Sequence, residues 1–257
     1  MSKMKKILFS PKTKRLEKLS KLFPKRIKEL EKVFSKRTSV YIDYANVFHW
    51  SKKLNWHIDL KRLKQLLDSF KMVQKVRFYN GFLKGDKISI DLIQEAEKAN
   101  YEVCTKPVKI IKISIDVSGI SQNSPAVLEK FIKPSLLRLL DLSTVEYLND
   151  KLRQLNQRGI LFIEHRKCNF DVEISRDILL DFEKNKIENF VLWSGDSDFA
   201  DLVSQLQKNN KNVFIFATAR RVSVELAQTK APIFEIKKIK EFICWPREIS
   251  DEIKNKI

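Results

Sequence analysis

Short apolar segments alternate with amphipathic segments along most of the chain. The apolar segments are rich in β-branched and aromatic residues, as buried strands are, and lie at 39–43, 75–79, 101–104, 160–163, 191–193, 211–216 and 233–236. The amphipathic segments repeat apolar residues every three or four positions, as helices do, over 60–70, 88–99, 171–182, 201–208 and 222–229. This alternation predicts an α/β fold with a mostly parallel central sheet covered by helices.

The alternation breaks between about 106 and 158. Residues 106–116 alternate Val and Ile with Lys, which predicts an extended ribbon, and residues 131–156 carry leucines at helical spacing. We therefore predict an inserted segment made of a ribbon and helices. Three roles are open for it, namely a substrate lid, a dimer contact that makes a homo-oligomer, or a structural cover for an edge of the sheet.

Residues 1–38 form a basic arm ahead of the first strand. Apolar residues recur at helical spacing on both sides of Pro24, which predicts two short amphipathic helices. The arm holds 14 Lys and Arg against three Glu, so it carries most of the chain's formal net charge of +18. We predict an arm (1–38), a central domain (39–236) and a charged tail (237–257).

So basic a chain suggests a polyanionic partner such as RNA. In the arm, the expected RNA contacts are Lys14, Arg15, Lys25 and Arg26. Contact with an acidic membrane, or a helical hairpin that simply packs on the domain with a solvated Lys face, would give the same pattern. A charge that serves only solubility is a further alternative.

Several classes of protein lose support from the sequence. No apolar run approaches the roughly 20 residues of a membrane span, and the three cysteines lie far apart without a CxxC pair. A zinc site or a disulfide framework is therefore not expected, and a reducing, cytoplasmic location is. The sequence also has no Walker A, GxGxxG or GxSxG motif, which argues against nucleotide-triphosphate, dinucleotide and acyl-transfer chemistry.

Carboxylates follow predicted strands or open predicted helices in three separate places. Asp43 ends the first strand, Asp171 opens a helix, and Asp196 with Asp198 follows the strand at 191–193. In a doubly wound sheet such positions converge on one crevice. Oxygen ligands of this kind suit Mg²⁺ or Mn²⁺, ions that promote displacement at phosphorus. Each carboxylate could instead serve only as a helix cap.

Three motifs in this order resemble the NYN domain, a LabA-like branch of the PIN-like ribonuclease superfamily. They are Tyr41-Ile-Asp-Tyr-Ala-Asn46, Phe170-Asp-Val-Glu-Ile-Ser-Arg-Asp177 and Trp193-Ser-Gly-Asp-Ser-Asp-Phe199. The resemblance covers roughly 39–104 and 160–236. It implies a three-layer α/β/α fold and an endoribonuclease that depends on Mg²⁺ or Mn²⁺.

The resemblance also implies roles for individual residues. Asp43, Asp171, Asp196 and Asp198 would bind the metal, and Asn46 would orient the first of them or the substrate. The supporting residues that it implies are Asp177, Ser194, Ser197 and Ser223. We expect Arg220 and Arg221, together with the arm, to steer RNA toward the carboxylates.

Two other functions remain open from the sequence. The first is an NYN module that binds RNA or a protein without cleavage, because Cys168-Asn-Phe precedes Asp171 where the family usually has Lys-Gly. The second is a metal-dependent phosphatase, although Asp43-Tyr-Ala lacks the second Asp of a DxD motif.

Overall fold

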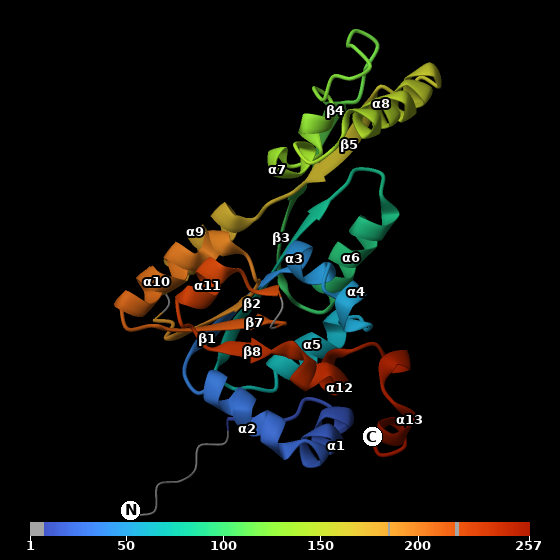
Figure 1. The fold of residues 1–257 in the computed structure, drawn as a ribbon. Helices are drawn as coiled ribbons and strands as arrows, with labels where there is room; N and C mark the ends of the chain where they lie inside the picture. The colour runs from blue at the N-terminus through green and yellow to red at the C-terminus, as the bar shows by residue number, and fades with distance from the viewer. Residues whose placement is uncertain (1–7, 185, 219–220) are drawn as a thin grey trace, which may run out of the picture. The chain divides into compact units, whose positions relative to one another are not determined.

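The computed structural model describes residues 8–184, 186–218 and 221–257, and it divides into two compact units (Figure 1). The first unit comprises the chain up to Pro107 and from Cys168 onward. The second comprises Val108–Lys167.

A six-stranded parallel sheet forms the centre of the first unit, in the order β3-β2-β1-β6-β7-β8. Its strands are β1 (Thr38–Asp43), β2 (Val73–Phe82), β3 (Glu102–Pro107), β6 (Asn189–Trp193), β7 (Asn212–Ala217) and β8 (Ile233–Glu235). The order reverses at β1, since the chain moves outward to β2 and β3 and later returns to β6 on the other side. Ligands bind at such switch points in open α/β sheets.

Helices cover both faces of this sheet, which confirms the predicted three-layer α/β/α fold (Figure 1). One layer contains α3 (Tyr44–Phe48), α4 (Ser51–Leu54), α5 (Leu60–Leu67) and α6 (Lys87–Lys98). The other contains α9 (Asp171–Lys184), α10 (Ala200–Lys208) and α11 (Val224–Gln228). Asp59 caps α5, because its side chain accepts a hydrogen bond from the backbone N–H of Arg62.

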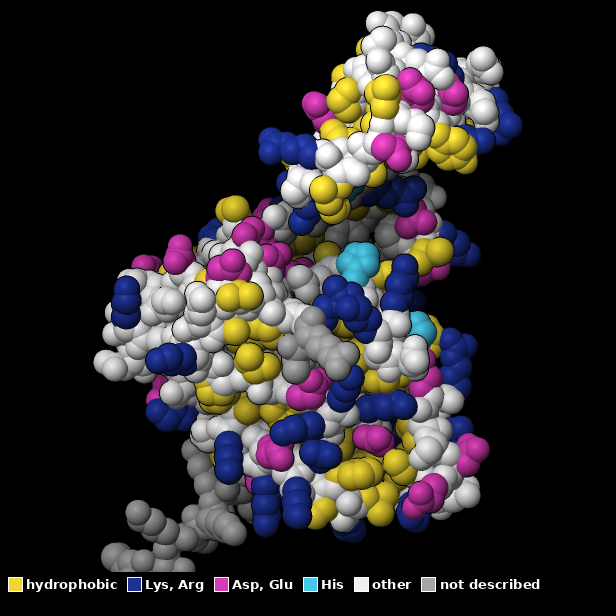
Figure 2. Space-filling view, in the orientation of Figure 1, with side chains coloured by type: hydrophobic (Ala, Val, Ile, Leu, Met, Phe, Trp, Pro, Cys, Tyr) yellow, Lys and Arg dark blue, Asp and Glu magenta, His cyan; other side chains and the backbone are white. Residues whose placement is uncertain are grey.

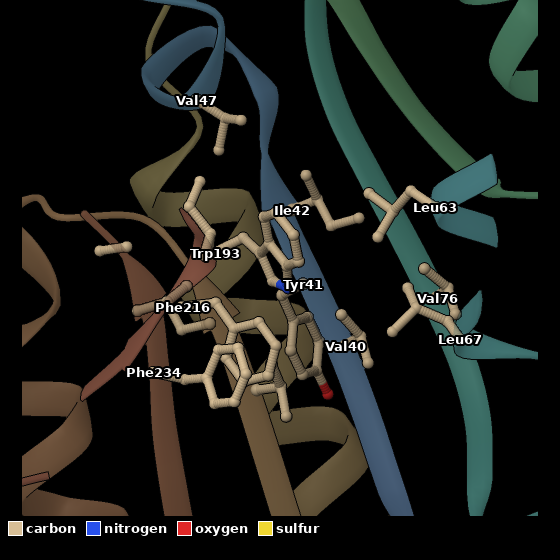
Figure 3. Packing of buried hydrophobic residues seen from close by; sticks show 14 of the residues in the cluster. Val40, Tyr41, Ile42, Val47, Leu63, Leu67, Val76, Trp193, Phe216 and Phe234 are labelled. Carbon is tan, nitrogen blue, oxygen red and sulfur yellow. The ribbon is translucent and has the colours of Figure 1, made fainter. Parts of the chain in front are cut away.

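The core lies on both sides of β1, every residue of which is buried. On one face Leu63 and Leu67 of α5 lie beside Val76 of β2 (Figure 3). On the other face Tyr41 of β1 stacks on Phe190 of β6 and donates its hydroxyl to Asp181 of α9. A strand covered on both faces has no solvated side, which explains why β1 appears in the sequence as a continuous apolar run.

The two amphipathic helices of the arm are present as α1 (Lys14–Leu22) and α2 (Pro24–Val33), with Pro24 at the first turn of α2. Leu16, Leu19 and Leu30 are almost fully buried and belong to the same core as the sheet. The apolar stripes of the arm therefore pack on the first unit, and its lysines form the solvated face.

The tail also returns to the first unit. It contains α12 (Lys240–Ile243) and α13 (Asp251–Lys254), with short 3₁₀ turns at Ile236–Ile239 and Pro246–Glu248. Phe242 and Ile243 are completely buried, and α12 packs against α5. Among the described helices, none combines the length and the apolar character that crossing a bilayer requires.

The second unit is a two-stranded antiparallel ribbon with helices. It contains β4 (Lys109–Ser114), β5 (Phe162–Lys167), a 3₁₀ turn (Leu128–Lys130), α7 (Pro134–Leu137) and α8 (Leu142–Gln157). Its small core includes Ile115, Val117 and Val127. The strand expected at 160–163 forms slightly later and pairs with β4 outside the central sheet, because its alternating partner is the Val/Ile/Lys ribbon. The unit thus extends past 158, where the sequence had suggested that the insertion ends.

Candidate active site

The polar ends of β1 and β6 meet at the switch point of the sheet. Ile42 of β1 lies opposite Trp193 of β6, so the residues that follow, Asp43 and Ser194, are neighbours. The Ser194 hydroxyl donates a hydrogen bond of 3.2 Å to Asp43 Oδ2. Parallel pairing therefore brings the first and third sequence motifs together, as the positions of their strands predicted.

Local hydrogen bonds hold each acidic turn. Asp43 Oδ1 accepts from the backbone N–H of Asn46 at 3.3 Å and caps α3. Asp196 caps a 3₁₀ turn by accepting from the N–H of Asp198 at 3.3 Å, and its own N–H donates to Ser194 Oγ at 3.3 Å. The Ser197 hydroxyl donates to Asp196 at 3.4 Å. The capping alternative thus describes part of what Asp43 and Asp196 do, and capping leaves each carboxylate with further lone pairs.

The electrostatics link the three acidic segments. Burial raises the pKa of Asp43 to about 6, and the charges of Asp171 and Asp196 add to this rise, while the bonds from Asn46 and Ser194 oppose it. Burial likewise raises the pKa of Asp171 to about 6, a hydrogen bond from the Asn169 side chain opposes this rise, and Asp198 and Asp196 add to it. Like charges have this effect only at short range, so the four carboxylates form one acidic cluster.

One oxygen of the acidic cluster has no partner. Asp171 Oδ1 is buried and accepts no hydrogen bond among the described residues. Among the described residues, no Lys or Arg forms an ion pair with Asp43, Asp171, Asp196 or Asp198. An unpaired buried oxygen is costly, and carboxylate oxygens are the donors that Mg²⁺ and Mn²⁺ prefer. The donor set therefore fits a hard divalent cation.

The four carboxylates do not form a preassembled metal cage in this structure. Within the described ranges, no three His, Cys, Asp or Glu residues are close enough together to form a ready metal cage. Mutual repulsion keeps carboxylates apart when no cation lies between them. The cluster thus has the donor chemistry of a cation site.

Asp177 lies on α9, nearly two turns beyond Asp171, and accepts hydrogen bonds from Tyr79, Arg176 and the Cys104 thiol. It accepts a 3.0 Å bond from the Tyr79 hydroxyl and bonds of 2.7 and 2.9 Å from the guanidinium of Arg176. Asp177 therefore holds the side chains of Tyr79 and Arg176 beside α9.

Gly195 sets the position of the acidic turn after β6. A Cβ atom at this position would lie 1.7 Å from the backbone oxygen of Arg221, and the oxygen of Gly195 accepts a 2.9 Å bond from the N–H of Ser223. The hydroxyl of Ser223 caps α11 through the N–H of Leu226. The close approach needs glycine, and it brings Arg221 to the edge of the acidic turn. Arg220 lies outside the described residues.

The basic residues expected to hold RNA differ in their availability. Arg15 is committed to the fold, because its guanidinium donates to the carbonyl oxygens of Glu241 and Phe242. Lys14 and Lys25 are exposed.

A basic depression near the acidic cluster was not anticipated from the sequence. Its volume is about 540 Å³, and its lining residues are Asn46, His49, Trp50, Lys52, Lys53 and Arg221. Figure 2 shows His, Lys and Arg side chains over α3 and α4, with Asp and Glu side chains beside α9. The spacing of Asn46, His49, Trp50 and Lys53 at i, i+3, i+4 and i+7 was the signal available, since these positions share one helical face.

The chain has a three-layer α/β fold with an acidic cluster at the switch point of its sheet, and comparisons with known proteins add a family resemblance. Residues 141–234 match the model of the NYN domain, which belongs to the PIN-like nuclease superfamily. The matched segment covers less than half of the chain and includes Asp171, Asp196 and Asp198. A comparison with curated proteins gives no match.

A solved structure supports the fold. The crystal structure of a protein of unknown function from Vibrio parahaemolyticus matches with a TM-score of 0.51 at 16% identity, over 82% of this chain and 96% of the other. At this level of identity the similarity concerns the fold alone.

Proposed function

We propose that this protein is a metal-dependent endoribonuclease that hydrolyses RNA phosphodiester bonds at the acidic cluster with Mg²⁺ or Mn²⁺. The observation that carries the proposal is the buried Asp171 Oδ1, which has no hydrogen-bond partner among the described residues and belongs to a cluster of four carboxylates. A structural carboxylate would have a basic or N–H partner for this oxygen. A cation ligand keeps the oxygen available.

Asp43, Asp171, Asp196 and Asp198 would hold the cation. When bound, such an ion neutralises charge on the scissile phosphate and lowers the pKa of water. Asn46 and Ser194 orient the Asp43 carboxylate through the hydrogen bonds described above. The Ser194 and Ser197 hydroxyls fix the turn that carries Asp196 and Asp198.

The basic side chains would hold the RNA backbone. Arg221 is attached to the acidic turn through the Gly195 contact, and the exposed Lys14 and Lys25 extend the positive surface along the arm. Phosphate contacts of this kind bind RNA regardless of sequence and weaken as salt rises. All three cysteines are free thiols, which is in keeping with a reducing compartment such as the cytoplasm.

The test is cleavage of a labelled single-stranded RNA in Mn²⁺, with binding of Mn²⁺ measured separately by calorimetry. Asp196→Asn should lower the cleavage rate at least about 100-fold and weaken Mn²⁺ binding, because one charged donor is lost. Asp201→Asn is a matched control, since Asp201 lies in the next helical turn, is exposed and lies outside the acidic cluster. Equal cleavage by the wild type and by Asp196→Asn would remove the proposal.

A second candidate is an NYN module that binds RNA without cleaving it. The Cys168-Asn-Phe sequence ahead of Asp171, where the family usually has Lys-Gly, favours it. It predicts RNA binding that depends on salt but is the same in EDTA and in Mn²⁺, with no products after long incubation. The two candidates therefore differ in a single experiment with and without the metal.

A further inference from the structure

An apolar cavity lies on the first unit, apart from the acidic cluster. Its volume is about 460 Å³, and its lining comes from α3, α4, α5, α6 and the segments that carry Trp56 and Trp245. Tyr44, Val47 and Leu60 form a buried part of the wall, while Phe48 and Ile88 are exposed. Such a cavity is large enough for one planar heterocycle and small for a folded polymer.

Helices α3 and α4 separate this cavity from the basic depression. Asn46, His49 and Lys53 line the depression, whereas Val47, Phe48 and Ser51 line the cavity. The same short stretch therefore presents cationic groups to one side and apolar and aromatic groups to the other. Single-stranded nucleic acid requires this combination, because its phosphates bind cations and its bases stack on rings.

The polar groups of the cavity argue against a phosphate inside it. The charged side chains of its lining are Asp91 and Glu95, and no Lys or Arg is among the described lining residues. Neither carboxylate accepts a hydrogen bond or pairs with a basic group in the described chain. Two carboxylates repel a phosphate and accept hydrogen bonds from N–H groups, as they do from the amino groups of bases.

Phe48 offers the stacking surface. Its side chain is 54% exposed, although it touches Tyr44 on one side with ring centroids 6.1 Å apart. The ring of Trp245, in contrast, is already stacked on His57 at 4.1 Å and lies against the guanidinium of Arg247. An exposed aromatic ring at the mouth of an apolar cavity is a platform for an unstacked base.

We propose that this cavity binds one base of the RNA substrate, a base with an exocyclic amino group that Asp91 or Glu95 accepts while Phe48 stacks on its face. This proposal rests on the proposed function, which identifies the bound polymer as RNA. Asp43 caps the first turn of α3 and Phe48 is its last residue. At a rise of about 1.5 Å per residue the bound base would belong to a nucleotide near the acidic cluster.

The experiment measures the binding of fluorescein-labelled ten-nucleotide oligo(A), oligo(C) and oligo(U) to the full chain in EDTA, by fluorescence anisotropy. Oligo(A) and oligo(C) should bind about tenfold more tightly than oligo(U), which has no exocyclic amine. Phe48→Ala should weaken oligo(A) about tenfold. Phe131→Ala is the matched control, because Phe131 is also exposed and does not line the cavity.

Two further variants separate the cavity from general charge. Ser51→Trp should fill the cavity and abolish the preference for oligo(A), with folding checked by circular dichroism. If that variant does not fold, the double variant Asp91→Asn, Glu95→Gln should remove the preference and leave oligo(U) binding unreduced. Lys53→Ala should weaken the binding of all three oligonucleotides equally, because the Lys53 side chain would contact phosphates.

Equal affinity for the three oligonucleotides, or a preference that survives both cavity variants, would overturn the proposal. Free adenosine that binds as tightly as oligo(A) would also overturn it, in favour of a small-molecule site. These results are distinct from failure of the proposed function. If the protein cleaves RNA in Mn²⁺ without base preference, only the proposal for the cavity fails. If it prefers oligo(A) but never cleaves RNA, only the proposed hydrolysis fails.

Discussion

Two buried groups of acids lie near β1, and they differ in their partners. Tyr41 points toward α9, where Asp181 accepts its hydroxyl at 2.7 Å and also pairs with Arg77 and Lys75. Two residues further along β1, Asp43 faces other carboxylates and no basic side chain in the described chain.

The pKa values of the two groups move in opposite directions. Burial by itself raises the pKa of Asp181, but the bonds from Arg77 and Tyr41 outweigh it and the pKa is lowered. Burial raises the pKa of Asp43 to about 6, and neighbouring charges add to the rise. Asp181 thus has the features of an acid that supports the fold, and Asp43 those of an acid that is kept for a ligand.

The largest expected effect comes from breaking the partnered group. Asp181→Ala should lower the free energy of unfolding by about 3 kcal/mol, because it leaves the buried ends of Arg77 and Tyr41 without their acceptor. Urea denaturation measures this change. Glu102→Gln is the control, since Glu102 pairs with the same Arg77 but is half exposed, and it should cost less than about 1 kcal/mol. Equal losses in the two variants would contradict the contrast.

A smaller effect of opposite sign is expected at the acidic cluster. Without metal, Asp43→Asn should stabilise the protein by about 1 kcal/mol, because an amide keeps the acceptor for the Asn46 N–H and removes a buried charge beside Asp171 and Asp196. The same denaturation experiment in EDTA measures it. A clear loss of stability would mean that the Asp43 charge is compensated in the fold.

The smallest expected effect is on the free energy of unfolding at acidic pH. The folded pKa of Asp181 is lowered, so its charge stabilises the protein above the unfolded pKa of about 3.9, and this contribution is lost as pH falls through the folded pKa. Between pH 6 and pH 4 the unfolded state gains protons that the folded Asp181 does not. The wild type should therefore lose about 0.4 kcal/mol more than Asp181→Asn over this interval. Parallel stability curves for the two proteins would refute this.

The fold could be predicted largely because strand and helix have different periods. The buried run at 39–43 and the break between two helices at Pro24 needed only local chemistry, and each is present in the structure. The pairing of β5 with β4 was missed, since an apolar run such as Ile160–Ile163 does not encode its partner. The commitment of Arg15 to backbone oxygens was missed for a similar reason, because its acceptors are more than 200 residues away.

The candidate site was predictable where a strand ends in an acid. Asp43 and Ser194 could be placed together because β1 and β6 are parallel neighbours. The apolar cavity could not be foreseen, because it joins α3 with Trp245 near the other end of the chain. Sequence patterns define one face of a helix, whereas a cavity depends on what packs opposite that face.

The contact between Gly195 and Arg221 has a consequence for how the molecule could change its specificity. Because the two backbones touch where a Cβ atom would have to lie, any side chain at 195 would push apart the segment that carries the acids and the segment that carries the arginine. The separation between the acidic turn and the backbone of Arg221 is thereby fixed by the main chain. Under the proposed function, substitutions that change RNA preference are therefore expected at the exposed surface of α3 and α4 rather than at this junction, where glycine has no Cβ atom.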